Sequence, residues 1–231
     1  MIQISNLSKK YGETVFFSDL NYTFENACIY GLVGRNGAGK TTLLNILSNY
    51  DKNYTGVISI DRKKMNKVDY LDMPVAYAMD QPSFFNELTI YENLLLIASS
   101  RKIKKQEAFD KIERILDGLG LKKYENYSPL EVSKGTMQRL NNACAMIQEE
   151  KITIFDEPFS GLDPVQMKLL ENVIVEFHKK EKGIYIISSH DIECLQNVCD
   201  KCLLLHNGQI REINMEEVDR EEIAKILSEG E

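Results

Sequence analysis

A glycine-rich segment that ends in a lysine and two threonines carries the clearest chemistry in this sequence. Residues 34–42 read GRNGAGKTT and match the pattern GxxxxGK[ST], which binds phosphate groups when it follows a strand and opens a helix. Glycines let the backbone N–H groups turn toward phosphate oxygens, and the N-terminus of the helix adds a favourable dipole. The motif predicts a nucleotide site made of Gly34, Asn36, Gly37, Ala38, Gly39, Lys40, Thr41 and Thr42.

Three side chains of this loop have separate expected roles. Lys40 is expected to bridge the β- and γ-phosphates, and Thr41 to offer its hydroxyl to Mg²⁺. Thr42 is expected to approach the α-phosphate. ATP and Mg²⁺ are therefore the predicted cofactors.

Two adjacent carboxylates follow a short apolar run in the second half of the chain. Ile152 to Phe155 predicts a buried strand, and Asp156 and Glu157 come directly after it. Because buried carboxylates are costly unless they are used, we expect Asp156 to hold Mg²⁺ through water and Glu157 to polarise the attacking water. Alone, the pair fits a solvated loop equally well, but the phosphate loop upstream favours catalysis.

The elements around these motifs alternate between strands and helices. Strands are expected at 28–33, 152–156, 184–188 and 202–206, with helices starting at Gly39 or Lys40, spanning about 136–148, and following Pro164. Strands that alternate with helices predict a mainly parallel sheet with both faces covered. The fold class is therefore α/β of the P-loop NTPase type.

Two further regions differ from this core. The first eighty residues predict short strands at 2–4, 15–17, 22–24, 56–60 and 75–79, and an N-terminal β lobe is expected within this region. From Leu88 to Leu119 the apolar spacing is helical, which predicts an inserted helical lobe over about 86–136. An acidic amphipathic helix is expected over 215–227. We expect a single domain, with the core and β lobe at 1–85 and 137–231.

Composition narrows the classes of function. The chain has 231 residues, 43% hydrophobic content and a formal charge of −7, which argues against a strongly basic nucleic-acid-binding surface. No apolar run approaches the roughly 20 residues that cross a bilayer. Five cysteines fit a reducing cytosol, and Cys199 and Cys202 form a CxxC pair better explained as thiols at a helix-to-strand junction than as a metal site.

Taken in order along the chain, these residues resemble the ATP-binding subunits of ABC (ATP-binding cassette) transporters. Residues 132–139, VSKGTMQR, align with the family signature LSGGQxQR, with Lys134 and Thr136 in place of a glycine and a glutamine. Ser133 and Gly135 are retained, so the resemblance implies that they contact nucleotide from the start of a helix. The family fold adds an antiparallel β lobe and an inserted helical lobe to the parallel core.

The resemblance assigns roles to four other positions. Tyr11 is similar to the aromatic residue that stacks on adenine, and Gln81 to the glutamine that couples Mg²⁺ and the attacking water to the helical lobe. The turn SGLD at 160–163 resembles one that crosses the dimer interface. His190, directly after a buried strand, is similar to the switch histidine that contacts the γ-phosphate.

The resemblance also implies the partners. Ser133 and Gly135 face away from their own phosphate loop toward a second ATPase subunit, so closure of a homodimer or heterodimer around ATP would drive a separate integral-membrane subunit. We expect a cytoplasmic protein, peripheral at the inner face of the membrane, that is similar to bacterial drug or antimicrobial-peptide exporters. Other functions considered are an iron–sulfur-assembly ATPase of the same family and a small-molecule P-loop kinase.

Overall fold

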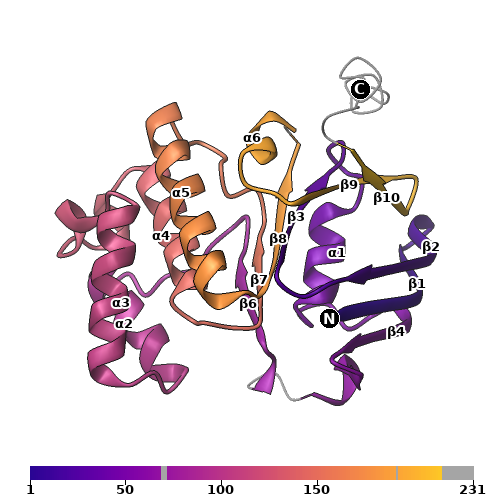
Figure 1. Ribbon diagram of the computed structural model, residues 1–231, viewed down its shortest axis with the longest axis horizontal. Helices are drawn as coiled ribbons and strands as arrows, with labels where there is room; N and C mark the ends of the chain where they lie inside the picture. Colours follow the sequence, from indigo (N-terminus) through magenta and orange to yellow (C-terminus); the bar gives the residue numbers. More distant parts are fainter. Residues whose placement is uncertain (69–71, 191, 215–231) are drawn as a thin grey trace.

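The computed structural model describes residues 1–68, 72–190 and 192–214. The helix expected over 215–227 lies outside these residues. Figure 1 shows a β lobe at one end, a central sheet and a group of helices at the other end. The phosphate loop lies between the β lobe and the central sheet.

The β lobe is a four-stranded antiparallel sheet with the order β2-β1-β4-β5. Its strands are β1 (Ile2–Tyr11), β2 (Thr14–Phe24), β4 (Thr55–Ile60) and β5 (Lys63–Lys64), and a 3₁₀ turn, η1 (Met65–Lys67), follows. The sequence predicted two short strands where β2 is continuous. Register shifts between β1 and β2 break the alternation of apolar residues that would have shown one strand.

The central sheet has six strands in the order β10-β9-β3-β8-β7-β6. They are β3 (Cys28–Val33), β6 (Val75–Ala78), β7 (Ile152–Phe155), β8 (Ile184–Ser189), β9 (Lys201–His206) and β10 (Gln209–Ile213). All neighbours are parallel except the β9–β10 hairpin. Every residue of β3, β7 and β8 is buried, as expected for strands covered on both faces.

Helices cover both faces of this sheet. The helix α1 (Lys40–Leu47) packs its leucines and Ile46 against apolar residues of both sheets. On the opposite face, α4 (Lys134–Met146) and α5 (Pro164–Glu181) share one apolar core with the strands. A short helix, α6 (Glu193–Gln196), follows β8.

The remaining helices lie beyond α4, away from the β lobe (Figure 1). They are α2 (Ile90–Ser100), α3 (Lys105–Gly118), η3 (Lys122–Tyr124) and η4 (Pro129–Glu131). The α2 helix begins after Thr89, which forms a capping box with Glu92. The predicted fold class, a mainly parallel α/β core with an antiparallel β lobe and added helices, is confirmed.

Candidate active site

The loop between β3 and α1 has the geometry of a phosphate cradle. Gly37 and Gly39 have φ values of 78° and 99°, which are left-handed conformations that glycine adopts without a steric cost. A side chain at Gly39 would also meet Phe16 and Phe17 of β2 at 3.1 Å. Gly39 caps α1 without a side-chain hydrogen bond, so the first N–H groups of the helix face an anion site without competition from a capping side chain.

Lys40 is the first residue of α1, and its side chain turns back over the loop. Its side chain is nearly buried, and its ammonium group donates to the Gly34 carbonyl at 2.7 Å. The same Nζ atom lies 3.4 Å from Oε1 of Glu157. The lysine of the phosphate loop is thus brought into contact with the carboxylate that follows β7.

Asp156 is fully buried beside β8. Its Oδ1 accepts a hydrogen bond of 2.6 Å from the Ser188 hydroxyl, and the Tyr77 hydroxyl lies 3.3 Å from Oδ2. Burial raises the pKa of the Asp156 carboxyl, and hydrogen bonds from Ser188 and Thr41 oppose that rise. The contact with Thr41 links the end of β7 to the start of α1.

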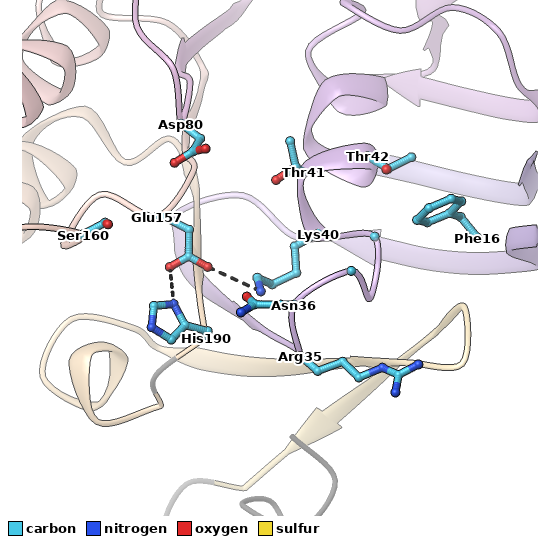
Figure 2. A pocket seen from close by; sticks show the side chains of 12 residues that line it. Phe16, Arg35, Asn36, Lys40, Thr41, Thr42, Asp80, Glu157, Ser160 and His190 are labelled. Carbon is cyan, nitrogen blue, oxygen red and sulfur yellow. Dashed lines mark hydrogen bonds and ion pairs between the residues drawn. The ribbon is translucent and has the colours of Figure 1, made fainter. Parts of the chain in front are cut away.

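Glu157 forms the second contact of its carboxylate with His190. The Nδ1 atom of His190 lies 2.9 Å from Oε2 of Glu157. Glu157 has φ 49°, and its N–H donates to the Ser188 hydroxyl at 2.8 Å, so its backbone turns out of the strand direction. This conformation directs the side chain toward Lys40 and His190, as Figure 2 shows.

These groups line one cavity of about 340 Å³. Of the residues proposed from the sequence, it brings together Asn36, Gly37, Gly39, Lys40, Thr41, Thr42, Glu157 and His190. Phe16, Arg35, Asp80 and Ser160 also line it, and the sequence interpretation assigned none of these side chains to the nucleotide site (Figure 2). Asp80 follows β6, which is the strand beside β7, so the position at a common sheet edge was the signal that could have found it.

Seven proposed residues lie outside this lining. Asp156 lies behind the cavity, where it reaches Thr41, and Lys40 bonds the Gly34 carbonyl. The Ala38 N–H bonds the Arg35 carbonyl within the loop. Gln81 is exposed, and its neighbour Asp80 lines the cavity instead. The others are Tyr11, Ser133 and Gly135.

Ser133 and Gly135 lie at the start of α4. Ser133 is exposed and caps the helix by accepting from the Thr136 N–H at 3.2 Å. Gly135 is buried, and a side chain there would meet the Gly161 carbonyl at 3.1 Å. One turn later, the Gln138 amide lies 3.3 Å from the Glu157 carbonyl. The signature segment therefore packs on the turn after β7 of its own chain.

The donors near the loop suit Mg²⁺. Thr41 and Asp156 supply hard oxygen atoms side by side, and Mg²⁺ prefers such ligands together with phosphate oxygens and water. No cluster of three or more His, Cys, Asp or Glu ligands occurs in the described parts of the chain.

The sequence and the fold were compared with those of known proteins. Residues 17–160 match the family model described as ABC transporter. The chain is 30% identical to the bacitracin transport ATP-binding protein BcrA of Enterococcus faecalis over 95% of this chain and 71% of that protein. It is 29% identical to the tungstate uptake system ATP-binding protein TupC of Peptoclostridium acidaminophilum, over 91% and 97% of the two chains.

A solved structure described as the ATP-binding subunit of an ABC transporter superposes on the chain with a TM-score of 0.85. The two are 26% identical, and the match covers 98% of this chain and 94% of the other. Within the ranges that the structure describes, none of the helices has the length and apolar character of a membrane span.

Proposed function

Since this chain belongs to the ABC transporter family as an ATP-binding, ATP-hydrolysing subunit, we propose that it hydrolyses ATP in the cavity between α1 and β7, with Glu157 as general base. The contact of Glu157 with both Lys40 and His190 carries this proposal. It joins a phosphate-binding cation, a base and a positioning histidine at one end of the phosphate loop.

The residues suggest an order of events. A triphosphate in the loop offers Lys40 oxygens with more charge than the Glu157 carboxylate, so the ammonium exchanges Glu157 for phosphate. Glu157 then keeps its contact with His190, and its freed Oε1 can accept a proton from a water molecule. His190 is exposed beside it and can hold that water near the γ-phosphate.

Mg²⁺ would be held by Thr41 and, through water, by Asp156, and it would neutralise the charge on the β- and γ-phosphates. Ser188 orients Asp156 for this role through its 2.6 Å hydrogen bond. We also place Gln81 near the ion in the loaded enzyme, because it adjoins the cavity residue Asp80.

The second half of the active site comes from another copy or a related subunit in this proposal. Ser133 lies exposed at the N-terminus of α4, outside the cavity of its own chain. A helix start with an exposed hydroxyl is suited to covering the γ-phosphate bound by a partner. ATP thereby favours a closed dimer, and cleavage removes the charge that holds it closed.

We further propose that the dimer drives export through an integral-membrane subunit, with this chain peripheral at the inner face of the membrane. The likeness to a bacitracin transport protein supports this direction, and the likeness to a tungstate uptake protein supports the opposite one equally. The variant signature VSKGTMQR adds a resemblance to the ATP-binding subunits of bacterial exporters. Inside-out vesicles carrying the co-purified membrane subunit would accumulate cargo on addition of ATP, whereas an importer would not.

Hydrolysis without an acceptor tests the central proposal. The purified chain with Mg²⁺ and ATP should release phosphate and ADP in equal amounts, and EDTA should stop the reaction. A kinase of small molecules would release little phosphate with or without its acceptor, and would form ADP only when the acceptor was added, because the phosphoryl group is transferred to the acceptor. An absence of nucleotide binding by the wild-type chain would overturn the assignment of the cavity.

A further inference from the structure

Tyr11, at the end of β1, is held by three side chains, from β1, from β2 and from the segment between α1 and β4. Its hydroxyl donates to Oδ2 of Asp51 at 2.5 Å. The ammonium of Lys9 lies over the ring, 4.2 Å from its centroid. The ring of Phe16 meets it edge to face, with the two centroids 5.5 Å apart. The position of the ring is therefore fixed through its hydroxyl, by Lys9 on one face and by the perpendicular ring of Phe16.

The carboxylate that holds Tyr11 is itself fixed. Its Oδ2 also pairs with Lys9 at 2.7 Å, and its Oδ1 accepts from the Asn53 N–H at 2.9 Å. Lys9 is nearly buried and donates to the Asn53 carbonyl at 2.6 Å. A buried ammonium requires such partners, so the Lys9–Asp51 pair is a rigid support.

The ring still has a free surface, and it adjoins the nucleotide cavity. Tyr11 is 48% exposed although Lys9 covers one face. Phe16, its neighbour, lines the cavity near Thr42, at the end away from Glu157 and His190 (Figure 2). A triphosphate with its γ-phosphate at Glu157 would therefore lead its base toward Tyr11.

We propose that Lys9 and Asp51 are positioning residues that hold the Tyr11 ring ready for a nucleobase to stack on its open face. This inference rests on the proposed function, because it needs the nucleotide in the cavity. The side chain has little freedom left to lose on binding, which lowers the entropic cost of the complex. Because the Tyr11 hydroxyl already donates to Asp51, the base can contact the ring only by stacking on its face. Stacking depends little on the polar groups at the edge of a purine.

Affinity for ADP, which is not hydrolysed, tests this by calorimetry. Tyr11→Phe keeps the ring and removes only the hydroxyl, and ordering one side chain on binding should raise the Kd about two- to tenfold. Tyr11→Ala loses the stacking surface and should raise the Kd roughly five- to a hundredfold. In ATP hydrolysis by Tyr11→Phe, the loss should fall on KM rather than kcat.

In the wild-type background, Asp51→Ala should raise the Kd for ADP about as much as Tyr11→Phe does. When Tyr11 is already Ala, Asp51→Ala should not change the Kd further. This loss of additivity marks a residue that acts through Tyr11, and a general effect on the fold would persist in both backgrounds. Asp61→Asn is the matched control, because Asp61 also pairs with an ammonium group, that of Lys151 at 3.1 Å, but does not touch Tyr11. It should bind ADP as the wild type does.

Unchanged ADP affinity in Tyr11→Phe would overturn the inference, and so would an equal effect of Asp51→Ala in both backgrounds. Tyr11→Phe leaves the Lys9–Asp51 pair intact, so the test stands even if Asp51→Ala fails to fold. Lys40→Ala distinguishes a failure of the proposed nucleotide site from a failure of the positioning role. If that variant binds ADP like the wild type, the cavity assignment fails, whereas full sensitivity to Lys40 with none to Tyr11 defeats only the positioning role.

Discussion

Two helix starts in this chain are suited to phosphate, and they are built in opposite ways. The α1 helix begins at Gly39 without a side-chain cap, and it opens into a cavity lined by Lys40 and Glu157. The α4 helix begins at Ser133, whose own hydroxyl accepts from the Thr136 N–H, and it lies outside that cavity. The first turn of α1 has no capping side chain, so an anion can accept hydrogen bonds from its N–H groups. The first turn of α4 already has a capping hydroxyl within the same chain. The difference favours nucleotide binding at α1, and in the function proposed above α4 acts only when a partner approaches.

The largest effect should come from Glu157→Gln. Loss of a general base typically costs about 10²- to 10⁴-fold in rate, and the neutral amide preserves the shape of the cavity. We expect phosphate release to fall by that factor while ATP still binds and holds a dimer, measured by sedimentation with and without ATP. Hydrolysis at the wild-type rate would remove Glu157 from the chemistry.

Lys40→Ala should act on affinity. The ammonium contributes a charged hydrogen bond to phosphate, so its loss should weaken nucleotide binding about ten- to a hundredfold. Lys151→Ala is a suitable control, since the Lys151 side chain is 72% exposed and pairs with Asp61, and neither residue lines the cavity. Equal affinities in the two variants would break the assignment of α1 as the binding helix.

Ser133→Ala tests the proposed role of the start of α4. Both Ser133 and Thr89 cap a helix, so either alanine should cost about 1 kcal/mol of unfolding free energy. Only Ser133→Ala should also lower ATP hydrolysis, by about tenfold, because only it removes a hydroxyl from a partner's phosphate. Affinity for ADP in the monomer should stay unchanged. A matching loss of hydrolysis in Thr89→Ala would trace the effect to stability instead.

The smallest effect concerns stability. Burial raises the pKa of the Asp156 carboxyl, which means that the folded chain destabilises the ionised form. Asp156→Asn keeps an oxygen for Ser188 without the charge, so at pH 7.5 with EDTA it should gain on the order of 1 kcal/mol in urea unfolding. The gain should shrink as the pH falls through the raised folded pKa and vanish below the unfolded pKa, where the carboxyl is protonated in both states. A loss of stability at pH 7.5 would contradict this cost of the charge.

Local patterns predicted the parts of the site that depend on local sequence. The strand, the glycine turn and the helix around Lys40 are contiguous, and the buried run before Asp156 is unambiguous. The β10 strand was missed because Gln209–Ile213 is a mixed polar edge strand. The Asn207–Gly208 turn, with φ values of 48° and 72°, was its available signal.

Positions set by distant elements could not be predicted in the same way. Phe16 enters the cavity because β2 of the other sheet packs on Gly39, a contact that no local pattern contains. Gln81 and Asp80 are neighbours on the segment after β6, and only coordinates distinguish which of them faces the loop. The tether of Tyr11 to Asp51 spans 40 residues and likewise depends on the folded lobe.

The contact of Gln138 with the Glu157 backbone has a consequence for a pair of such chains. The helix whose first turn would lie against a neighbour's nucleotide rests, one turn later, on the peptide that carries the base of its own chain. In the proposed dimer, a shift of the start of that helix on contact with the neighbour's nucleotide would therefore move the backbone of Glu157 in its own chain. ATP bound by one subunit would then affect the active site of the other. The rate of ATP hydrolysis should therefore rise more steeply than linearly with ATP concentration.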